Sequence, residues 1–407
     1  MTAASAASRT GLGRIELVEH GVPVEVALSA RQSSALRESE LVTITPGFGP
    51  GRWFVGPARF VGVARVGGVE VWVRPKLQIR RLLFLLGYAY DLSAWRQGHV
   101  EVDEDTDLLP AVATAFARQA DRAVAQGLIQ GYRTIEEHAP VLRGRIRTDE
   151  QLRRRFGLPI PLEVRYDDYT IDIAENRILR TTAERLLRVP RVPRRTRHDL
   201  LRLIRLLADV RPIGRGLAVP AWQPSRLNAR YHGAMRLGEL VLRGGSIEHA
   251  SGSVPVDGFM LNMPVLFEQF LTVALREALV PRGGRLDAQS HHFLDEEGRI
   301  RLKPDVVWYP RAEGSPSAVA DAKYKAEKPT GYPNADAYQM LAYCLRLGLP
   351  VGHLVYATGE TEPGRHRIIG TPVTLVRHAL DLDVTPEDLF GQVHDIAEAM
   401  AGRATPL

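Results

Sequence analysis

The sequence is poor in the residue types that most redox and zinc sites require. It has one cysteine, Cys344, so neither a disulfide framework nor a cysteine-ligated zinc site can form from this chain alone. Cys344 lies in the apolar stretch of residues 341–345, where we expect it to pack as a small hydrophobic side chain. His291 and His292 are the only adjacent histidines and no His-Glu-x-x-His motif is present, so strand surface is the simplest interpretation of that pair.

Nucleotide-binding and membrane-spanning patterns are also missing. The glycine-rich residues 46–51 are not followed by Gly-Lys-Ser or Gly-Lys-Thr, and Pro50 removes a backbone donor, so we predict a hairpin turn there and no nucleotide site. Apolar runs such as residues 82–89 are too short to cross a bilayer, and residues 1–11 lack the apolar core of a signal peptide. We expect a cytoplasmic protein with no membrane association, in which residues 1–12 form a flexible tail.

Charge is abundant and unevenly distributed. The net charge is +6 and the isoelectric point is near 9.5, which is compatible with nucleic-acid binding. Few acids accompany the arginines in the middle of the chain, so this segment could follow a phosphate backbone or face an acidic protein partner, and both interpretations stay open. These arginines are Arg153, Arg154, Arg155, Arg177, Arg180, Arg185, Arg188, Arg191, Arg194, Arg195, Arg197, Arg202 and Arg205.

The most informative pattern pairs a Pro-Asp dipeptide with an Asp-x-Lys triplet. Pro304-Asp305 is followed, sixteen residues after the aspartate, by Asp321-Ala-Lys323. In a strand, alternation would place Asp321 and Lys323 on one face, together with Lys325, and mainly apolar residues on the other. One face could then pack into a core while the other holds polar chemistry.

Asp305 is predicted to reach this face from a neighbouring strand. Residues 291–294 and 299–309 are predicted as two strands joined by the turn 295–298, with Asp305 inside the second strand. Two carboxylates brought together in this way suit Mg2+, a hard cation that prefers oxygen ligands. The Lys323 ammonium could orient an attacking water or stabilise negative charge on a phosphate.

Two helices are predicted to contribute further polar groups. Residues 263–279 form an apolar helical pattern that contains Glu268, whose burial would be costly unless a cation or donor meets it. After the triplet, Asp336, Gln339 and Tyr343 recur on one helical face and could support the metal, Lys323 or the DNA backbone.

In order and spacing, these residues resemble a known nuclease superfamily. Glu268, Asp305, Asp321 and Lys323 resemble the PD-(D/E)xK nucleases, and Gln339 with Tyr343 resembles the Gln-x-x-x-Tyr helix of some of their branches. The chain from about residue 61 to 356 is similar to the McrC family, the nuclease subunit of McrBC-type systems that restrict DNA containing 5-methylcytosine. The segments that carry this resemblance are residues 258–268, 321–325 and 338–343, preceded by Val73-Arg-Pro-Lys76, Leu142-Arg-Gly-Arg145 and residues 172–179.

The resemblance implies roles that composition alone could not indicate. It implies a Mg2+-dependent endonuclease in which Asp305 and Asp321 are metal ligands, Glu268 is a third, Lys323 lies beside the phosphate, and Gln339 and Tyr343 support them. It also implies two partners, DNA and an McrB-like AAA+ GTPase that recognises the modified base and whose hydrolysis this chain stimulates. A homodimer through the nuclease domain, and the use of GTP or ATP by the partner, stay open.

The predicted fold class is α/β, α+β overall, in three regions. Residues 13–80 are predicted as a β-rich domain, residues 81–250 as a mainly helical, arginine-rich partner-docking region, and residues 251–400 as the nuclease domain with a mixed sheet flanked by helices. Residues 251–255 are predicted as the linker between the last two. The helices expected in the middle region span residues 107–128, 176–187 and 198–210.

Two other functions stay open beside a motor-dependent nuclease. A non-cutting adaptor could activate an AAA+ ring if the metal site had decayed, although all four residue types of the site are present. A stand-alone nuclease of the same superfamily could act in DNA repair or on mobile elements, although the resemblance outside the nuclease domain disfavours it.

Overall fold

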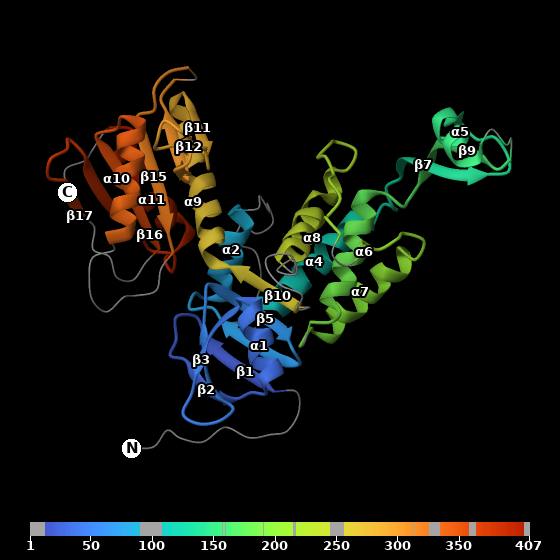
Figure 1. Cartoon of the computed structure of the whole chain (residues 1–407), viewed down its shortest axis with the longest axis horizontal. Helices are drawn as coiled ribbons and strands as arrows, with labels where there is room; N and C mark the ends of the chain where they lie inside the picture. The colour runs from blue at the N-terminus through green and yellow to red at the C-terminus, as the bar shows by residue number, and fades with distance from the viewer. Residues whose placement is uncertain are drawn as a thin grey trace. The chain divides into compact units, whose positions relative to one another are not determined.

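The chain divides into two compact units, Met1–Leu108 with Ala250–Leu407, and Leu109–His249. The computed structural model in Figure 1 describes residues 13–89, 108–156, 158, 160–189, 191–214, 217–244, 256–311, 313–324, 334–357 and 364–402. The predicted tail, the predicted linker and Lys325 lie outside these residues. The mixed α/β character predicted from the sequence is confirmed.

A four-stranded sheet of the first unit combines three strands from the N-terminal region with one strand from much later in the sequence. Its strand order is β1-β6-β5-β10, with β1 parallel to β6 and the other neighbours antiparallel. The strands are β1 (Arg14–Val18), β5 (Phe60–Val66), β6 (Val69–Arg74) and β10 (Val256–Asn262). The predicted boundaries therefore differ from the structure, because residues 256–262 were assigned to the nuclease domain and instead pair with β5.

A second, three-stranded sheet covers the rest of the N-terminal region. Its order is β2-β4-β3, from β2 (Val24–Ala27), β3 (Val42–Pro46) and β4 (Arg52–Pro57), and the hairpin predicted over residues 46–51 joins the last two. Helix α1 (Ala30–Ser39) was not predicted. It begins with a capping box in which Ser29 accepts from the Gln32 backbone and the Gln32 side chain accepts from the Ser29 backbone.

Two long helices of the first unit pack against each other. Helix α2 (Ile79–Ala89) lies against α9 (Met263–Leu279), where the rings of Tyr88 and Phe270 are 5.6 Å apart at 63°. The start of α9 follows from its sequence, because the Asn262 side chain accepts from the Val265 backbone and a proline occupies the first turn. The bounds of α9 agree with the predicted residues 263–279.

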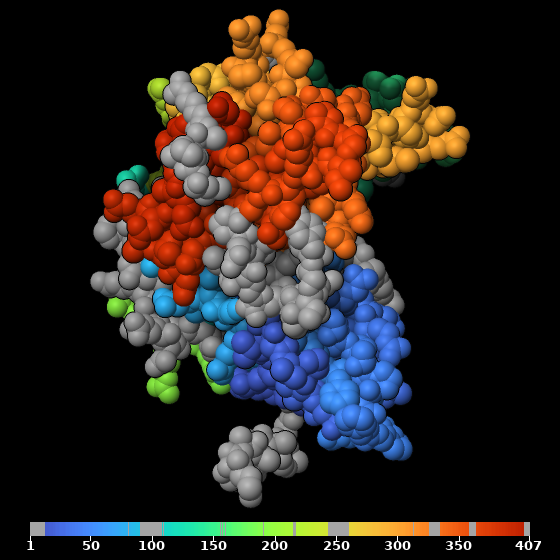
Figure 2. Space-filling view, turned by 90° about the vertical axis from the view of Figure 1, so that its left-hand side faces the viewer, coloured from blue at the N-terminus to red at the C-terminus, as the bar shows by residue number. Residues whose placement is uncertain are grey.

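The C-terminal part of the first unit is built on a six-stranded mixed sheet. Its order is β11-β14-β15-β16-β18-β17, and β15, β16 and β18 run parallel. Its strands are β11 (Arg285–Ala288), β14 (Val306–Tyr309), β15 (Ala318–Lys323), β16 (Val351–Ala357), β17 (Gly364–Arg367) and β18 (Thr374–Leu380). In Figure 2 the orange and red residues of this part gather into one continuous surface.

One predicted strand is two strands in the structure. β12 (His292–Phe293) and β13 (Arg301–Leu302) form the predicted hairpin, but β14 begins only at Val306 and belongs to the larger sheet. The break falls at Lys303-Pro304-Asp305, where proline has no N–H to donate to a ladder. Asp305 therefore lies directly before a strand and not inside one, as was predicted.

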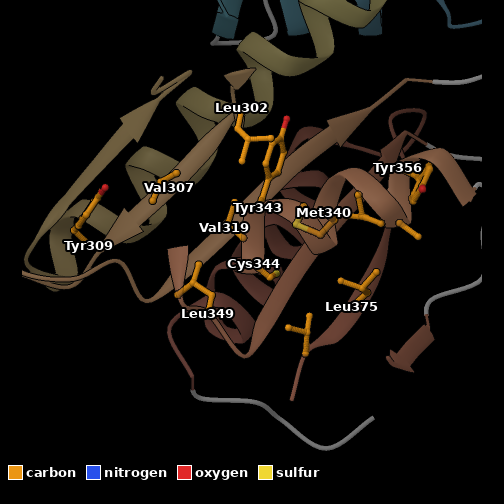
Figure 3. Close-up of a cluster of buried hydrophobic side chains, with 13 residues drawn as sticks. Leu302, Val307, Tyr309, Val319, Met340, Tyr343, Cys344, Leu349, Tyr356 and Leu375 are labelled. Atoms are coloured by element: carbon orange, nitrogen blue, oxygen red, sulfur yellow. The ribbon is translucent and has the colours of Figure 1, made fainter. Parts of the chain in front are cut away.

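Helices cover this sheet. Helix α10 (Asn334–Leu347) packs on the face of the sheet that carries Val319 and Leu375, as Figure 3 shows, and Leu354 belongs to the same buried cluster. Cys344 is buried in this cluster, as predicted. Helix α9 lies against β15, and α11 (Pro386–Met400) contacts both α9 and β18.

The second unit combines α-helices with a small sheet. Helices α4 (Leu108–Val124), α6 (Ala174–Leu186) and α7 (Arg194–Leu206) coincide closely with the predicted ones, and α8 (His232–Gly244) follows the 3-10 turn η1 (Ala229–Tyr231) and packs on α6. The sheet has the order β7-β9-β8 and is accompanied by α5. Its elements are β7 (Gly131–Ala139), β8 (Arg145–Ile146), α5 (Thr148–Arg155) and β9 (Leu162–Thr170). Among the described residues of both units, no helix is long and apolar enough to span a membrane.

Candidate active site

The Asp-x-Lys triplet lies on the last three residues of β15. β15 runs between β14 and β16, and Asp321 and Lys323 face the same side of the sheet, as the alternation predicted. The Lys323 ammonium contacts Oδ2 of Asp321, and it donates a hydrogen bond to Oε1 of Gln339 at 2.8 Å. Asp321 is 3 % exposed, so this ion pair lies almost out of water.

Asp305 reaches the same place from the turn before β14. Its Oδ2 accepts the backbone N–H of Ala322 at 2.7 Å. Ala322 is the residue between Asp321 and Lys323, so this bond holds the Asp305 carboxylate beside the triplet. Its backbone carbonyl accepts the N–H of Gln289 at 3.0 Å. The two predicted strand-derived carboxylates are therefore brought together, although Asp305 comes from a turn.

Glu268 approaches from the second turn of α9 and bonds a residue that was not predicted. Its Oε1 accepts the side-chain amide of Gln289, which also donates through its backbone to Asp305. Gln289 has φ of 49°, a left-handed conformation that aims it at both groups. No local motif surrounds Gln289 in the sequence, so only the fold reveals that it joins Glu268 to Asp305.

Burial raises the pKa of both aspartates, and the charges of neighbouring carboxylates add to this effect at Asp305. Burial, then the charges of Asp321 and Glu268, raises the pKa of Asp305 to about 8. Burial is also the largest cause of the raised pKa of Asp321, and the Lys323 ammonium opposes it. The carboxylates are thus held where their ionised forms repel each other, which is the situation that a bound cation relieves.

The predicted supporting residues lie on α10. Gln339 is exposed and accepts from Lys323, whereas Tyr343 is buried and donates its hydroxyl to the carbonyl of Lys303 at 3.1 Å, two residues before Asp305. Figure 3 places Tyr343 beside Leu302. Burial, then the charges of Asp321 and Asp305, raises the pKa of Tyr343, so its hydroxyl remains a donor. Asp336 is 3.9 Å from the Lys323 ammonium and accepts from Tyr356 at 3.0 Å.

The chemistry of this site fits a hard divalent cation. Asp305 and Asp321 offer carboxylate oxygens, and Oδ2 of Asp321 is buried without a well-formed hydrogen bond although the Lys323 ammonium contacts it. Within the described parts of the chain, no three His, Cys, Asp or Glu side chains are already arranged to hold a metal ion. Glu268 would have to exchange its bond with Gln289 for a position as third ligand, and its role stays a prediction.

The raised pKa of Asp305 makes the free energy of unfolding of the metal-free protein depend on pH. A carboxyl whose pKa is raised on folding favours the folded state while it is protonated, so stability is lost as pH rises from the unfolded value of 3.8 to about 8 and is level above that. We expect metal-free Asp305→Asn to exceed the wild type in free energy of unfolding at pH 8 by more than about 1.4 kcal/mol, the value of one pKa unit. The two proteins should converge near pH 4.

Urea denaturation in a chelator at pH 4 to 9 measures this difference. Asp287→Asn, which replaces a partly exposed carboxylate on the neighbouring β11, is the matched control and should not change the pH profile. Parallel pH profiles for wild type and Asp305→Asn would contradict the repulsion inferred between the site carboxylates.

The family of the chain is decided by comparison with known sequences. A family model described as the McrBC 5-methylcytosine restriction system component matches residues 56–357. The chain belongs to this family. The match confirms the family predicted from the sequence, and it extends from β4, through the second unit, to the end of β16.

One solved structure of the McrBC family shares the fold. A chain of the half-complex from a tetradecameric assembly of Thermococcus gammatolerans McrB AAA+ hexamers with bound McrC is 18 % identical over 94 % of this chain and 98 % of its own, with a TM-score of 0.57. A chain of the Thermococcus gammatolerans McrBC complex is 20 % identical over 66 % of this chain and 88 % of its own, with a TM-score of 0.40, which is too low to support an argument. No curated protein sequence matches this chain.

The arginine-rich segment of this McrBC-family chain is partly structural. Arg180 donates to the carbonyls of Leu207 at 3.0 Å and Ala208 at 2.8 Å, where it satisfies the end of α7, and Arg185 donates to Leu242 at 3.2 Å. These side chains are committed to the fold of the second unit. Exposed arginines remain on the first turn of α7, namely Arg194, Arg195 and Arg197, where they are available to a phosphate backbone or an acidic protein surface.

Proposed function

We propose that this chain is the Mg2+-dependent DNA endonuclease subunit of a modification-dependent restriction system, one that cuts when an AAA+ GTPase partner activates it and that stimulates hydrolysis by that partner. The observation that carries the proposal is the contact of Lys323 with Asp321 and Gln339 beside the buried Asp305. Membership of the McrBC family and the likeness to a chain from an assembly of McrB hexamers with bound McrC support the partner.

The residues divide the chemistry of phosphodiester hydrolysis among them. Bound Mg2+ would polarise the phosphate and supply a nucleophilic water near neutral pH. Asp305 and Asp321 would hold the ion through their carboxylates, and because these must be deprotonated, affinity for the ion should rise as pH approaches 8. Lys323 would exchange part of its contact with Asp321 for the phosphate, where its charge stabilises the transition state.

Gln339 and the aspartates restrict where the Lys323 ammonium can point. The 2.8 Å bond to Gln339 holds the flexible lysine stem in one orientation, which reduces the freedom to be lost when the phosphate arrives. The Asp336 carboxylate, 3.9 Å from the ammonium, adds a negative charge on the same side of the site.

Cleavage of plasmid DNA tests the proposal. Methylated and unmethylated plasmid would be incubated with this chain, with and without an AAA+ protein of the McrB type and GTP, in Mg2+ and in chelator. We expect cutting of methylated plasmid only with all components present, together with faster GTP hydrolysis by the partner. Cutting by this chain alone would favour a stand-alone nuclease, and stimulated GTP hydrolysis without cutting would favour a non-cutting adaptor.

A further inference from the structure

A buried carboxylate of the N-terminal region contacts the end of the strand that carries Lys323. Glu19 directly follows β1 and is 3 % exposed. Its Oε2 accepts the backbone N–H of Lys76 at 2.9 Å, and its Oε1 accepts the hydroxyl of Tyr324 at 2.7 Å. The imidazole Nε2 of His20 is 3.7 Å from the same Oε1. A carboxylate so far from water costs free energy unless donors meet it, so these contacts are required for its burial.

Tyr324 lies between Glu19 and the helix that carries Glu268. Its ring is 6.0 Å from that of Phe267, the residue before Glu268, and 5.8 Å from that of His20. Burial, then the charge of Glu19, raises the pKa of Tyr324, so its hydroxyl remains a donor to the carboxylate. The Tyr324 side chain thus contacts both Glu19, at the end of β1, and α9. Tyr324 is also the residue that directly follows Lys323 in the chain.

The ladder of β15 ends directly before Tyr324. The register of β15 with β16 ends at the pair Lys323 and Tyr356, so Tyr324 is the first residue beyond the ladder. Successive side chains of a strand point to opposite faces. Tyr324 therefore points to the α9 side of the sheet when Lys323 points to the α10 side, toward Asp321 and Gln339. Holding the Tyr324 side chain in place thus also holds the backbone that orients Lys323.

We propose that Glu19 is a positioning residue for the candidate active site, which acts through Tyr324 to orient the Lys323 ammonium. The proposal rests on the proposed nuclease function. Glu19 touches neither metal ligand, so its loss should affect the rate of the chemical step and not the binding of DNA or metal.

Two substitutions and their combination test this. Glu19→Gln removes one acceptor, because its amide cannot accept from both the Lys76 N–H and the Tyr324 hydroxyl, and Tyr324→Phe removes the donor while keeping the ring on Phe267. We expect each to lower kcat of the complex with the AAA+ partner and GTP about 10- to 100-fold, with unchanged KM for DNA and unchanged Mn2+ affinity. The double variant should be no slower than the slower single variant, because both remove the same contact.

Hydrogen exchange provides a readout that does not need catalysis. In Glu19→Gln and Tyr324→Phe, the amides of residues 321–324 should exchange faster while the thermal midpoint of the chain changes little. Glu16→Gln, an exposed carboxylate on β1, and Tyr309→Phe, on β14, are the matched controls and should leave exchange and kcat unchanged.

The outcomes separate this proposal from the proposed function. Unchanged exchange in both variants, or faster exchange with wild-type kcat, would overturn a positioning role for Glu19. Additive losses of kcat in the double variant would also overturn it. A wild-type complex that does not cut would overturn the proposed nuclease, whereas faster exchange at residues 321–324 in the variants would still support the anchoring of Lys323 by Glu19.

Discussion

Replacing Lys323 or Asp321 by alanine is expected to lower the rate of DNA cleavage about 100- to 1000-fold, the effect of removing one charge-stabilising group from an active site. Lys323→Ala removes the cation that contacts Oδ2 of Asp321, and it leaves the phosphate without its ammonium. Asp321→Ala removes a carboxylate that would hold the metal. Both variants should fold, because burial already raises the pKa of Asp321 and makes its ionised form costly in the native state.

Cleavage and partner functions must be measured on the same preparations. The rate of methylated plasmid cutting should fall in both variants while stimulation of GTP hydrolysis by the AAA+ partner and the thermal midpoint stay near wild type. Asp287→Ala, which removes a half-exposed carboxylate from β11 in the same sheet, should cut at the wild-type rate. Cutting by a folded, nuclease-free preparation of Asp321→Ala at the wild-type rate would refute the site.

Most of the candidate site was predictable because its residues lie in regular elements. Alternation along β15 put Asp321 and Lys323 on one face, and the 3.6-residue period of α10 put Gln339 and Tyr343 on another. These patterns depend on short stretches of sequence and on burial of one face. They are reliable because β15 is covered on both faces, by α10 and by α9, so a slip of one residue would turn Asp321 and Lys323 away from α10 and toward α9.

The missing parts of the site depend on contacts between distant stretches of sequence. Gln289, the residue after β11, reaches Glu268, and Glu19 reaches Tyr324, 305 residues later in the sequence. No periodicity reports such contacts. The pairing of β10 with β5 is also a contact between distant stretches of sequence. The sequence of β10 does not say which sheet it joins, because a strand with one apolar face could equally pair with an edge of the nuclease sheet.

Two other errors had signals that could be read locally. The split between β13 and β14 follows from Pro304, which cannot donate to a ladder, so a strand through residues 299–309 was the weaker interpretation. The start of α1 is marked by Ser29 and Gln32 at capping-box spacing. This helix has few apolar residues, so it shows no clear helical periodicity to distinguish it from the β-rich segments on either side.

The largest effect on stability is expected in the second unit, at Asp172. This carboxylate is 8 % exposed and accepts from Arg177 Nε at 2.7 Å, from Arg177 Nη2 at 2.6 Å and from Arg133 Nη1 at 2.5 Å, while the Arg211 N–H donates at 2.9 Å. Burial tends to raise its pKa, but the bonds from Arg177 and Arg211 outweigh burial and lower it. Its stabilising contribution is therefore present above the unfolded pKa near 3.8 and lost as pH falls below that value.

Asp172→Ala should lower the free energy of unfolding of the second unit by about 2 to 3 kcal/mol at pH 7, because it leaves the partly buried Arg177 and Arg133 guanidinium groups and the Arg211 amide without their acceptor. Hydrogen exchange of α6 and α7 in the full chain measures this loss for the second unit. Asp121→Ala removes the carboxylate of an exposed pair with Arg202 in the same unit, and should cost no more than about 1 kcal/mol. Equal losses in the two variants would show that the bonds of Asp172 do not hold α6 to the segment after α7, and that packing of Leu179 and Leu203 suffices.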